Sequence, residues 1–226
     1  YKIEGFFNTQ QEVDDYVATT NNTWLVPAVG RWKIKDISGP NGVPDNVIND
    51  YDRTFLGSPH PDFQIGLHFS ISYKSFDFSS FIFWNQGGNL FNLTRRNIDF
   101  NTGFYNRSRR ILEDSWTSEN TDALLPKLDI NDSYSSRYIT DYFVEDASYL
   151  RLRQLTLGYT LPVNLIQRAR LTKLRVYFQA QNLFTFTRFS GMDPGLVFSG
   201  NDLGIGIYSG GNPTPKQILF GVNLGF

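Results

Sequence analysis

The sequence predicts an all-β protein, a transmembrane antiparallel β-barrel to which this chain contributes about the last six strands. Several segments long enough to span a membrane as strands alternate apolar and polar residues, so that one face suits lipid and the other suits a wet lumen. The connections between these segments are of two kinds, short and long. Aromatic residues make up 16% of the chain, and the aromatic girdles of a barrel would use them. Together these features favour a barrel wall.

The first two complete strands are predicted to form a hairpin. Alternate residues over 63–73 are apolar, and the residues between them are Gln, Gly, His or Ser. The alternation resumes over 76–84 after the two-residue turn Lys74-Ser75. Phe81 and Phe83 are out of phase with the apolar set, so we expect these two rings to line the lumen.

Two more strands are predicted over 149–161 and 173–187. In the earlier one, Leu150 and Leu152 are out of phase with the later leucines, so we expect a β-bulge near Arg153-Gln154. Slipping the strand over 173–187 by one residue would put Arg175 into lipid, where an Arg at the bilayer midplane costs roughly 2 to 4 kcal/mol. The apolar residues of this strand must therefore face outward.

The last strand shows the alternation most clearly. Its apolar residues occupy every second position, namely Ile218, Phe220, Val222, Leu224 and Phe226. The residues between them are mostly small or polar. We interpret the segment as the closing strand of a barrel. The alternative is an edge strand of a soluble sandwich.

The spacing of the strands predicts the two sides of the membrane. Short connections cover 74–75 and 162–172, whereas long ones cover about 8–61, 86–146 and 190–215. Because successive strands run in opposite directions, all short connections fall on one side, together with Phe226. Short periplasmic turns and long extracellular loops are typical of outer-membrane barrels.

The strand count predicts that the chain is part of a longer polypeptide. A truncated strand over 1–7 brings the total to about six, and about eight are needed to close even a barrel filled by side chains. An unpaired edge is unsatisfied in lipid, so we expect the remaining strands to come from a longer parent chain.

Composition excludes several classes of function. The 226 residues include no Cys, which excludes disulfides, thiolate metal sites and a Cys nucleophile. The net charge of −1 gives no electrostatic argument for binding nucleic acid. His60 and His68 lie in no recognisable catalytic triad motif, and we predict neither a catalytic nor a cofactor-binding site. The chain is therefore not expected to be an enzyme.

Five segments, in order along the chain, resemble motifs of the SusC/RagA group of TonB-dependent outer-membrane transporters. Residues 5–13 resemble the segment G-x-F-x-T-x-E-E that precedes a short helix, and 30–36 resemble G-D-I-K-Y-K-D. Residues 52–63 are close to D-R-x-x-I-G-x-P-x-P-x-F, the most specific motif of the set. Residues 147–159 are similar to A-S-Y-L-R-L-R-N-L-T-L-G-Y, and 181–194 to Q-N-L-F-T-F-T-x-Y-x-G-x-D-P.

The chain departs from the family pattern after Asp36. Members commonly carry D-x-N-G-D-G there, whereas this chain reads Asp36-Ile37-Ser38-Gly39-Pro40-Asn41-Gly42-Val43-Pro44-Asp45. Pro40 and the extra residue break the ligand spacing of a calcium loop. We therefore predict no metal site, and expect a turn-rich loop whose Asp and Asn side chains cap their own backbone.

The resemblance implies that residues 1–226 are the C-terminal portion of a barrel of about 22 strands, without its plug domain, earlier strands or TonB box. It implies a location in the outer membrane of a Gram-negative bacterium and active import of a bulky nutrient, an oligosaccharide or a peptide. TonB would supply the energy, and a SusD-like surface lipoprotein would cover the extracellular mouth. The alternative that the residues leave open is a soluble β-rich carbohydrate-binding module.

Three groups of residues are candidates for function. On the longest loop, four aromatic residues could stack on sugar rings or pack under the lipoprotein, or could simply fix the loop to the barrel rim: Trp116, Tyr134, Tyr138 and Tyr142. Tyr177, Gln179 and Gln181 should face the lumen, toward the plug or the substrate. The last apolar residues, Phe220, Val222, Leu224 and Phe226, resemble the assembly signal that the barrel-insertion machinery recognises, and also face lipid.

Overall fold

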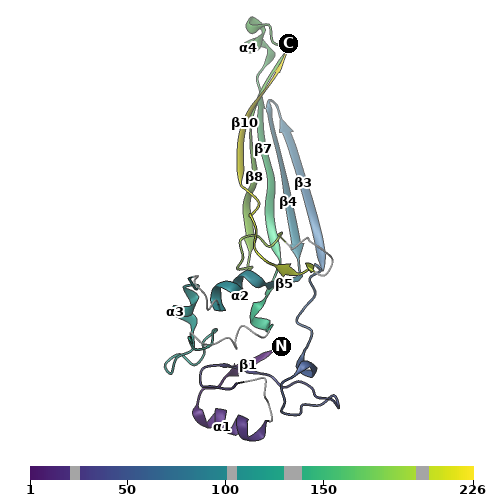
Figure 1. The fold of residues 1–226 in the computed structure, drawn as a ribbon. Helices are drawn as coiled ribbons and strands as arrows, with labels where there is room; N and C mark the ends of the chain where they lie inside the picture. The colour runs from purple at the N-terminus through teal and green to yellow at the C-terminus, as the bar shows by residue number, and fades with distance from the viewer. Residues whose placement is uncertain (21–25, 101–105, 130–138, 197–203) are drawn as a thin grey trace. The chain divides into compact units, whose positions relative to one another are not determined.

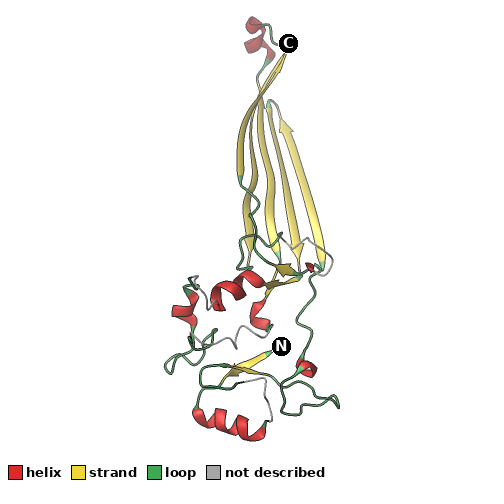
Figure 2. Ribbon diagram, viewed as in Figure 1, coloured by secondary structure: helices red, strands yellow, loops and turns green. Residues whose placement is uncertain are grey.

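The computed structural model describes residues 1–20, 26–100, 106–129, 139–196 and 204–226. The chain divides into two compact units. Unit 1 comprises 1–57, 90–145 and 207–209, and unit 2 comprises 58–89, 146–206 and 210–226. Unit 2 is a β-sheet, whereas unit 1 combines short strands with helices (Figures 1 and 2). Among the described residues, no helix has both the length and the apolar character needed to cross a membrane.

Unit 2 is built on one antiparallel sheet of five strands. Its spatial order is β10-β8-β7-β4-β3. The strands are β3 (Phe63–Tyr73), β4 (Phe76–Gln86), β7 (Tyr149–Thr160), β8 (Lys173–Thr187) and β10 (Gln217–Gly225). Each lies within two residues of the segment that the alternation predicts, which confirms the period-2 interpretation for all five.

The two faces of this sheet carry different side chains. Because residues that pair across strands share a face, the register aligns Phe78 with Leu157, Leu157 with Phe178, and Phe178 with Phe220. This apolar face remains exposed: 58% of Leu67 and 81% of Phe220 are accessible. A soluble sandwich would bury these side chains under a second sheet, and among the described residues no second sheet covers them.

A β-bulge keeps the leucines of β7 on one face. The register with both neighbouring strands shifts between Leu152 and Gln154, as predicted. Across from it in β8, Asn182 has a φ of 51°. Leu152 therefore pairs with Ile82 and Phe184 and lies on the same face as Leu155, although the two differ in sequence parity.

The short connections share one end of the sheet with the C-terminus. Lys74, with a φ of 53°, and Ser75 form the tight turn from β3 to β4. Residues 161–172 contain α4 (Val163–Ile166) and η3 (Gln167–Ala169) and return the chain to β8, which pairs with β10 up to Gly225 (Figure 1). We call this the Phe226 end.

Residues 1–7 do not belong to the barrel sheet, which corrects the prediction of a sixth strand. β1 (Ile3–Phe6) instead pairs with β2 (Trp32–Ile34) in a two-stranded ribbon of unit 1. Against the ribbon packs α1 (Gln10–Thr19), which begins where the Thr9 side chain accepts a hydrogen bond from the Glu12 amide. Their shared core consists of Phe7, Val13, Ile34 and Ile48.

The connection over 86–146 has secondary structure of its own, which strand periodicity did not predict. It contains β5 (Asn89–Asn92), α2 (Leu93–Phe100), α3 (Arg110–Asp114), η2 (Asp141–Phe143) and β6 (Val144–Asp146). The strands order as β6-β5-β9, where β9 is Ile207–Tyr208. A further single turn, η1 (Asp50–Asp52), is capped by Asn49.

Candidate functional site

The polar face of the sheet is organised by a bidentate ion pair. Arg175 on β8 donates from Nε to Oδ1 of Asp77 at 2.9 Å and from its terminal nitrogen to Oδ2 at 2.6 Å. The two residues lie on either side of β7, where Gly158 is the intervening residue. A Cβ on Gly158 would lie 2.4 Å from Asp77 Oδ1, so only glycine lets the guanidinium and carboxylate meet.

The three residues predicted to face the lumen lie on this polar face. Tyr177, Gln179 and Gln181 alternate with apolar residues in β8, on the same face as Arg175, and each is half-buried. The Tyr177 ring covers Gly221 of β10, where a Cβ would lie 2.2 Å from ring carbon Cζ. The polar character of the face agrees with the prediction, while contact with a plug or substrate stays a prediction.

A buried ion pair anchors the connection between β8 and β10 to the sheet. Arg151 of β7 and Asp193 are 5% and 3% exposed, and a terminal guanidinium nitrogen of Arg151 donates to Asp193 Oδ1. The other Asp193 oxygen accepts from the hydroxyl of Thr214 at 2.7 Å and from its amide at 3.1 Å. Arg151 Nε also donates to Thr185 Oγ1 at 3.0 Å. We call these four residues the loop anchor.

The electrostatics of the anchor favour its charged form. Burial of the Asp193 carboxyl acts to raise its pKa, but the hydrogen bonds from Thr214 and Arg151, together with the amides of Gly195 and Thr214, outweigh burial and hold the pKa below its ordinary value. The carboxylate is thus ionised and fully hydrogen-bonded at neutral pH. The anchor therefore fixes both ends of the segment from Asp193 to Thr214 to one strand of the sheet.

Trp116 packs inside unit 1. Its side chain is buried, and the indole Nε1 donates to Asn8 Oδ1 at 2.8 Å. The indole covers Gly30, which has a φ of 86° and where a Cβ would lie 2.6 Å from the ring. The indole thus packs against residues of another connection in unit 1, and its predicted roles, stacking on sugar, packing under the lipoprotein or fixing the loop to the rim, stay predictions.

Tyr142 also has protein partners. Its hydroxyl donates to Oδ2 of the buried Asp99 at 2.9 Å, and the Arg95 guanidinium lies 3.9 Å from the centre of its ring. Burial, with Asp99 adding to it, raises the pKa of Tyr142 to about 12. Tyr134 and Tyr138 lie outside the described residues.

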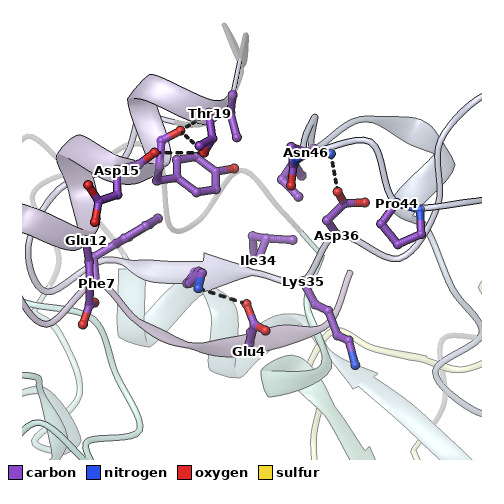
Figure 3. Close-up of a pocket in the computed structure, with 14 residues that line it drawn as sticks. Glu4, Phe7, Glu12, Asp15, Thr19, Ile34, Lys35, Asp36, Pro44 and Asn46 are labelled. Carbon is purple, nitrogen blue, oxygen red and sulfur yellow. Dashed lines mark hydrogen bonds and ion pairs between the residues drawn. The ribbon is translucent and has the colours of Figure 1, made fainter.

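A polar pocket of about 500 Å³ lies within unit 1 between α1, the β1–β2 ribbon and the segment 36–46 (Figure 3). Glu4 on its floor lies 3.4 Å from the Lys33 ammonium. Asp36 on its far wall accepts from the Asn46 amide at 2.5 Å, while its Oδ1 is buried and has no hydrogen-bond partner among the described residues. Burial raises the pKa of Asp36, and the neighbouring Asp52 raises it further. Among the described residues, no three His, Cys, Asp or Glu side chains gather as metal ligands.

The chain resembles known proteins in both sequence and structure. No family model matches the chain. TonB-dependent receptor P26 of Formosa agariphila is 31% identical over the whole chain, which covers 22% of that protein. TonB-dependent receptor SusC of Bacteroides thetaiotaomicron is 31% identical over 80% of the chain and 17% of its own length. Among solved structures, the RagAB peptide importer in the open-open state has a TM-score of 0.66 at 26% identity, covering 86% of this chain and 20% of that one.

The chain belongs to the SusC/RagA group of TonB-dependent receptors. It spans about a fifth of the length of these relatives. The family resemblance and the fold class predicted from sequence are thereby confirmed.

In this SusC/RagA-like chain, two of the recognised motifs meet at the loop anchor. Arg151 belongs to the segment 147–159 and Asp193 to 181–194, and sequence analysis assigned neither residue a role. The sequence did contain a signal for Arg151: a charged residue within a strand of this kind needs an oppositely charged partner when it is buried. Which carboxylate supplies it, however, follows only from the folded register.

Proposed function

We propose that the protein to which this chain belongs imports a bulky nutrient across the outer membrane, and that this chain supplies the last strands of its barrel. The observation that carries the proposal is the five-stranded sheet with an exposed apolar face and a charged, hydrogen-bonded polar face. An apolar exterior and a polar interior are what a membrane barrel needs. The likeness to receptors named TonB-dependent and to the RagAB importer supports the same function.

In this proposal the apolar face contacts outer-membrane lipid and the polar face borders the lumen. The Phe226 end is then periplasmic, because it carries the short turns. The long connections, which contain unit 1, leave the opposite end of the sheet and are extracellular. A SusD-like lipoprotein would cover them, TonB would supply energy through a region outside this chain, and the substrate would be an oligosaccharide or a peptide.

The RagAB neighbours are described as peptide transporters and importers, which favours testing peptides first. The experiment measures uptake of fluorescent peptides and of fluorescent oligosaccharides by cells that carry the full-length receptor. Three parallel strains each lack one gene: the receptor gene, the TonB gene, or the lipoprotein gene that neighbours the receptor gene. We expect uptake of one substrate class that disappears in each deletion strain.

Two results would contradict the proposal. One is uptake that continues without TonB. The other is a full-length protein that fractionates with soluble proteins and stays monodisperse in water, which is what the carbohydrate-binding module predicts. No contact among the residues that the structure describes favours that module or an enzyme over the transporter.

A further inference from the structure

An apolar groove of about 510 Å³ crosses the apolar face of the sheet near the Phe226 end. It follows one cross-strand row, in which Phe76, Tyr159, Val176 and Val222 are paired in succession. The two valines are smaller than the aromatic residues around them, and this difference in size leaves the hollow. The groove lies between two aromatic pairs: the Phe76 and Tyr159 rings, 4.6 Å apart, and the Phe178 and Phe220 rings, 5.3 Å apart.

The groove lies on the face of the sheet rather than at its edges. Further strands of a barrel extend a sheet by hydrogen bonding at the edge strands, here β3 and β10. They leave a hollow that spans β4, β7, β8 and β10 open to whatever surrounds the barrel. An occupant of this groove must therefore be a molecule outside the wall.

Exposed cations lie on the two turns at the end of the sheet next to the groove, where the nearby Asp77 carboxylate is already bound by Arg175. The turns over 73–76 and 161–173 contain Lys74, Arg168, Arg170 and Lys173, all exposed, and no Asp or Glu. The Lys74 ammonium lies 5.3 Å from the centre of the Tyr73 ring, on the apolar face, two residues from the groove residue Phe76. Consecutive Cα atoms lie about 3.8 Å apart, so the Cα atoms of Lys74 and Phe76 are at most about 7.6 Å apart across the turn.

The turn that carries the arginines also exposes apolar side chains. Val163 and Leu165 of α4 are 52% and 65% exposed, a few residues before Arg168 and Arg170. Exposed apolar residues beside arginines are typical of segments that lie at a lipid interface containing anionic headgroups. Cations at the Phe226 end and an apolar groove beneath them thus match the two parts of one amphiphile.

We propose that this groove binds an acyl chain of an anionic phospholipid of the periplasmic leaflet, whose phosphate lies among the exposed cations of the two turns. The inference rests on the proposed function, because it places the apolar face in the membrane and the Phe226 end at the periplasm. A second protein is a poorer match, since the groove lies on the apolar face that the proposed function places in lipid.

The test uses the full-length receptor, purified in a mild detergent, delipidated, and titrated with phosphatidylglycerol under native mass spectrometry. Val176→Phe and, separately, Val222→Phe fill the groove. Leu67→Phe is the matched control, because it adds a ring to the same face outside the groove. We expect either groove variant to lose most of the bound phosphatidylglycerol and the control to retain it.

A charge series tests the headgroup contact independently of packing. Lys74→Gln and Arg170→Gln should each weaken phosphatidylglycerol binding about fivefold, and should reduce its preference over phosphatidylcholine. Lys216→Gln, an exposed cation before the opposite end of β10, should change neither quantity.

Several results would overturn the proposal that the groove binds phospholipid. These are equal phosphatidylglycerol binding by the parent and both groove variants, an equal loss in Leu67→Phe, an equal effect of Lys216→Gln and Lys74→Gln, or no preference over phosphatidylcholine in the parent. Outer-membrane fractionation of the same strains separates this failure from failure of the proposed function. If the receptor reaches the outer membrane but gives any of these results, the lipid site is refuted and the proposed import function is not.

Discussion

At the scale of single residues, three glycines allow large side chains to pack on the polar face. Gly158 leaves room for the pair of Asp77 and Arg175, Gly221 lies under the Tyr177 ring, and a Cβ on Gly66 would approach the Phe81 ring to 3.1 Å. Glycine weakens a strand by itself, but here each one makes room for a neighbouring contact. Gly66, Gly158 and Gly221 therefore belong to the same arrangement as the side chains they accommodate.

Asp36 yields a prediction about pH. Burial and Asp52 raise its folded pKa above the ordinary value of 3.8, so the folded state binds a proton more readily than the unfolded state. Its contribution to stability is therefore lost as the pH rises from 3.8 through the folded pKa. Asp36→Asn removes this loss, because the new side chain does not ionise. Its amide oxygen can still accept the hydrogen bond from the Asn46 backbone N–H.

Hydrogen exchange in the full-length protein measures the effect. We expect Asp36→Asn to slow exchange over 36–52 at pH 7 relative to the parent, with the difference fading below 3.8. Asp122→Asn, an exposed carboxylate of unit 1, should leave both profiles unchanged. Faster exchange in Asp36→Asn at pH 7 would show that the ionised carboxylate stabilises the loop.

At the scale of elements, period-2 alternation located the five sheet strands and the bulge in β7, because lipid and lumen impose opposite demands on successive residues. It could not show that β1 pairs with β2, since a short alternating segment fits any sheet. The helices α1, α2 and α3 belong to unit 1, and a search for period-2 alternation carries no signal for helices. Contacts such as Arg151 with Asp193, 42 residues apart, depend on tertiary register.

The loop anchor yields a prediction at this scale. Asp193→Ala leaves Arg151 buried and unpaired, which costs about 3 to 5 kcal/mol when a buried pair is broken. The free energy is lost locally, so we expect faster hydrogen exchange at Gly195, Leu196 and Thr214 and faster proteolysis between Asp193 and Thr214.

The double variant Arg151→Met with Asp193→Ala is the control for the anchor. It removes the buried charge together with its partner, so it should recover much of the lost protection. Equal exchange in Asp193→Ala and the parent would mean that the connection between β8 and β10 is held by other contacts.

At the scale of the whole molecule, the apolar face of β10 has two predicted roles, contact with lipid and recognition during assembly, and position along the strand separates them. In the proposed orientation Phe220 lies deeper in the membrane than Phe226, by six residues, which is about 20 Å along the strand and about 15 Å in depth for a strand tilted by about 40°. A Lys on the lipid face costs about 2 to 4 kcal/mol at the midplane but about 0 to 1 near an interface. Solvation therefore predicts a defect for Phe220→Lys and almost none for Phe226→Lys, whereas an assembly signal predicts a defect for both. Leu219→Lys, on the polar face of the same strand and opposite Gln179, is the control and should assemble normally. We expect surface levels of the full-length receptor, measured by antibody labelling of intact cells, to fall in both phenylalanine variants. A normal surface level of Phe226→Lys would contradict the assembly role and leave lipid contact as the role of this face.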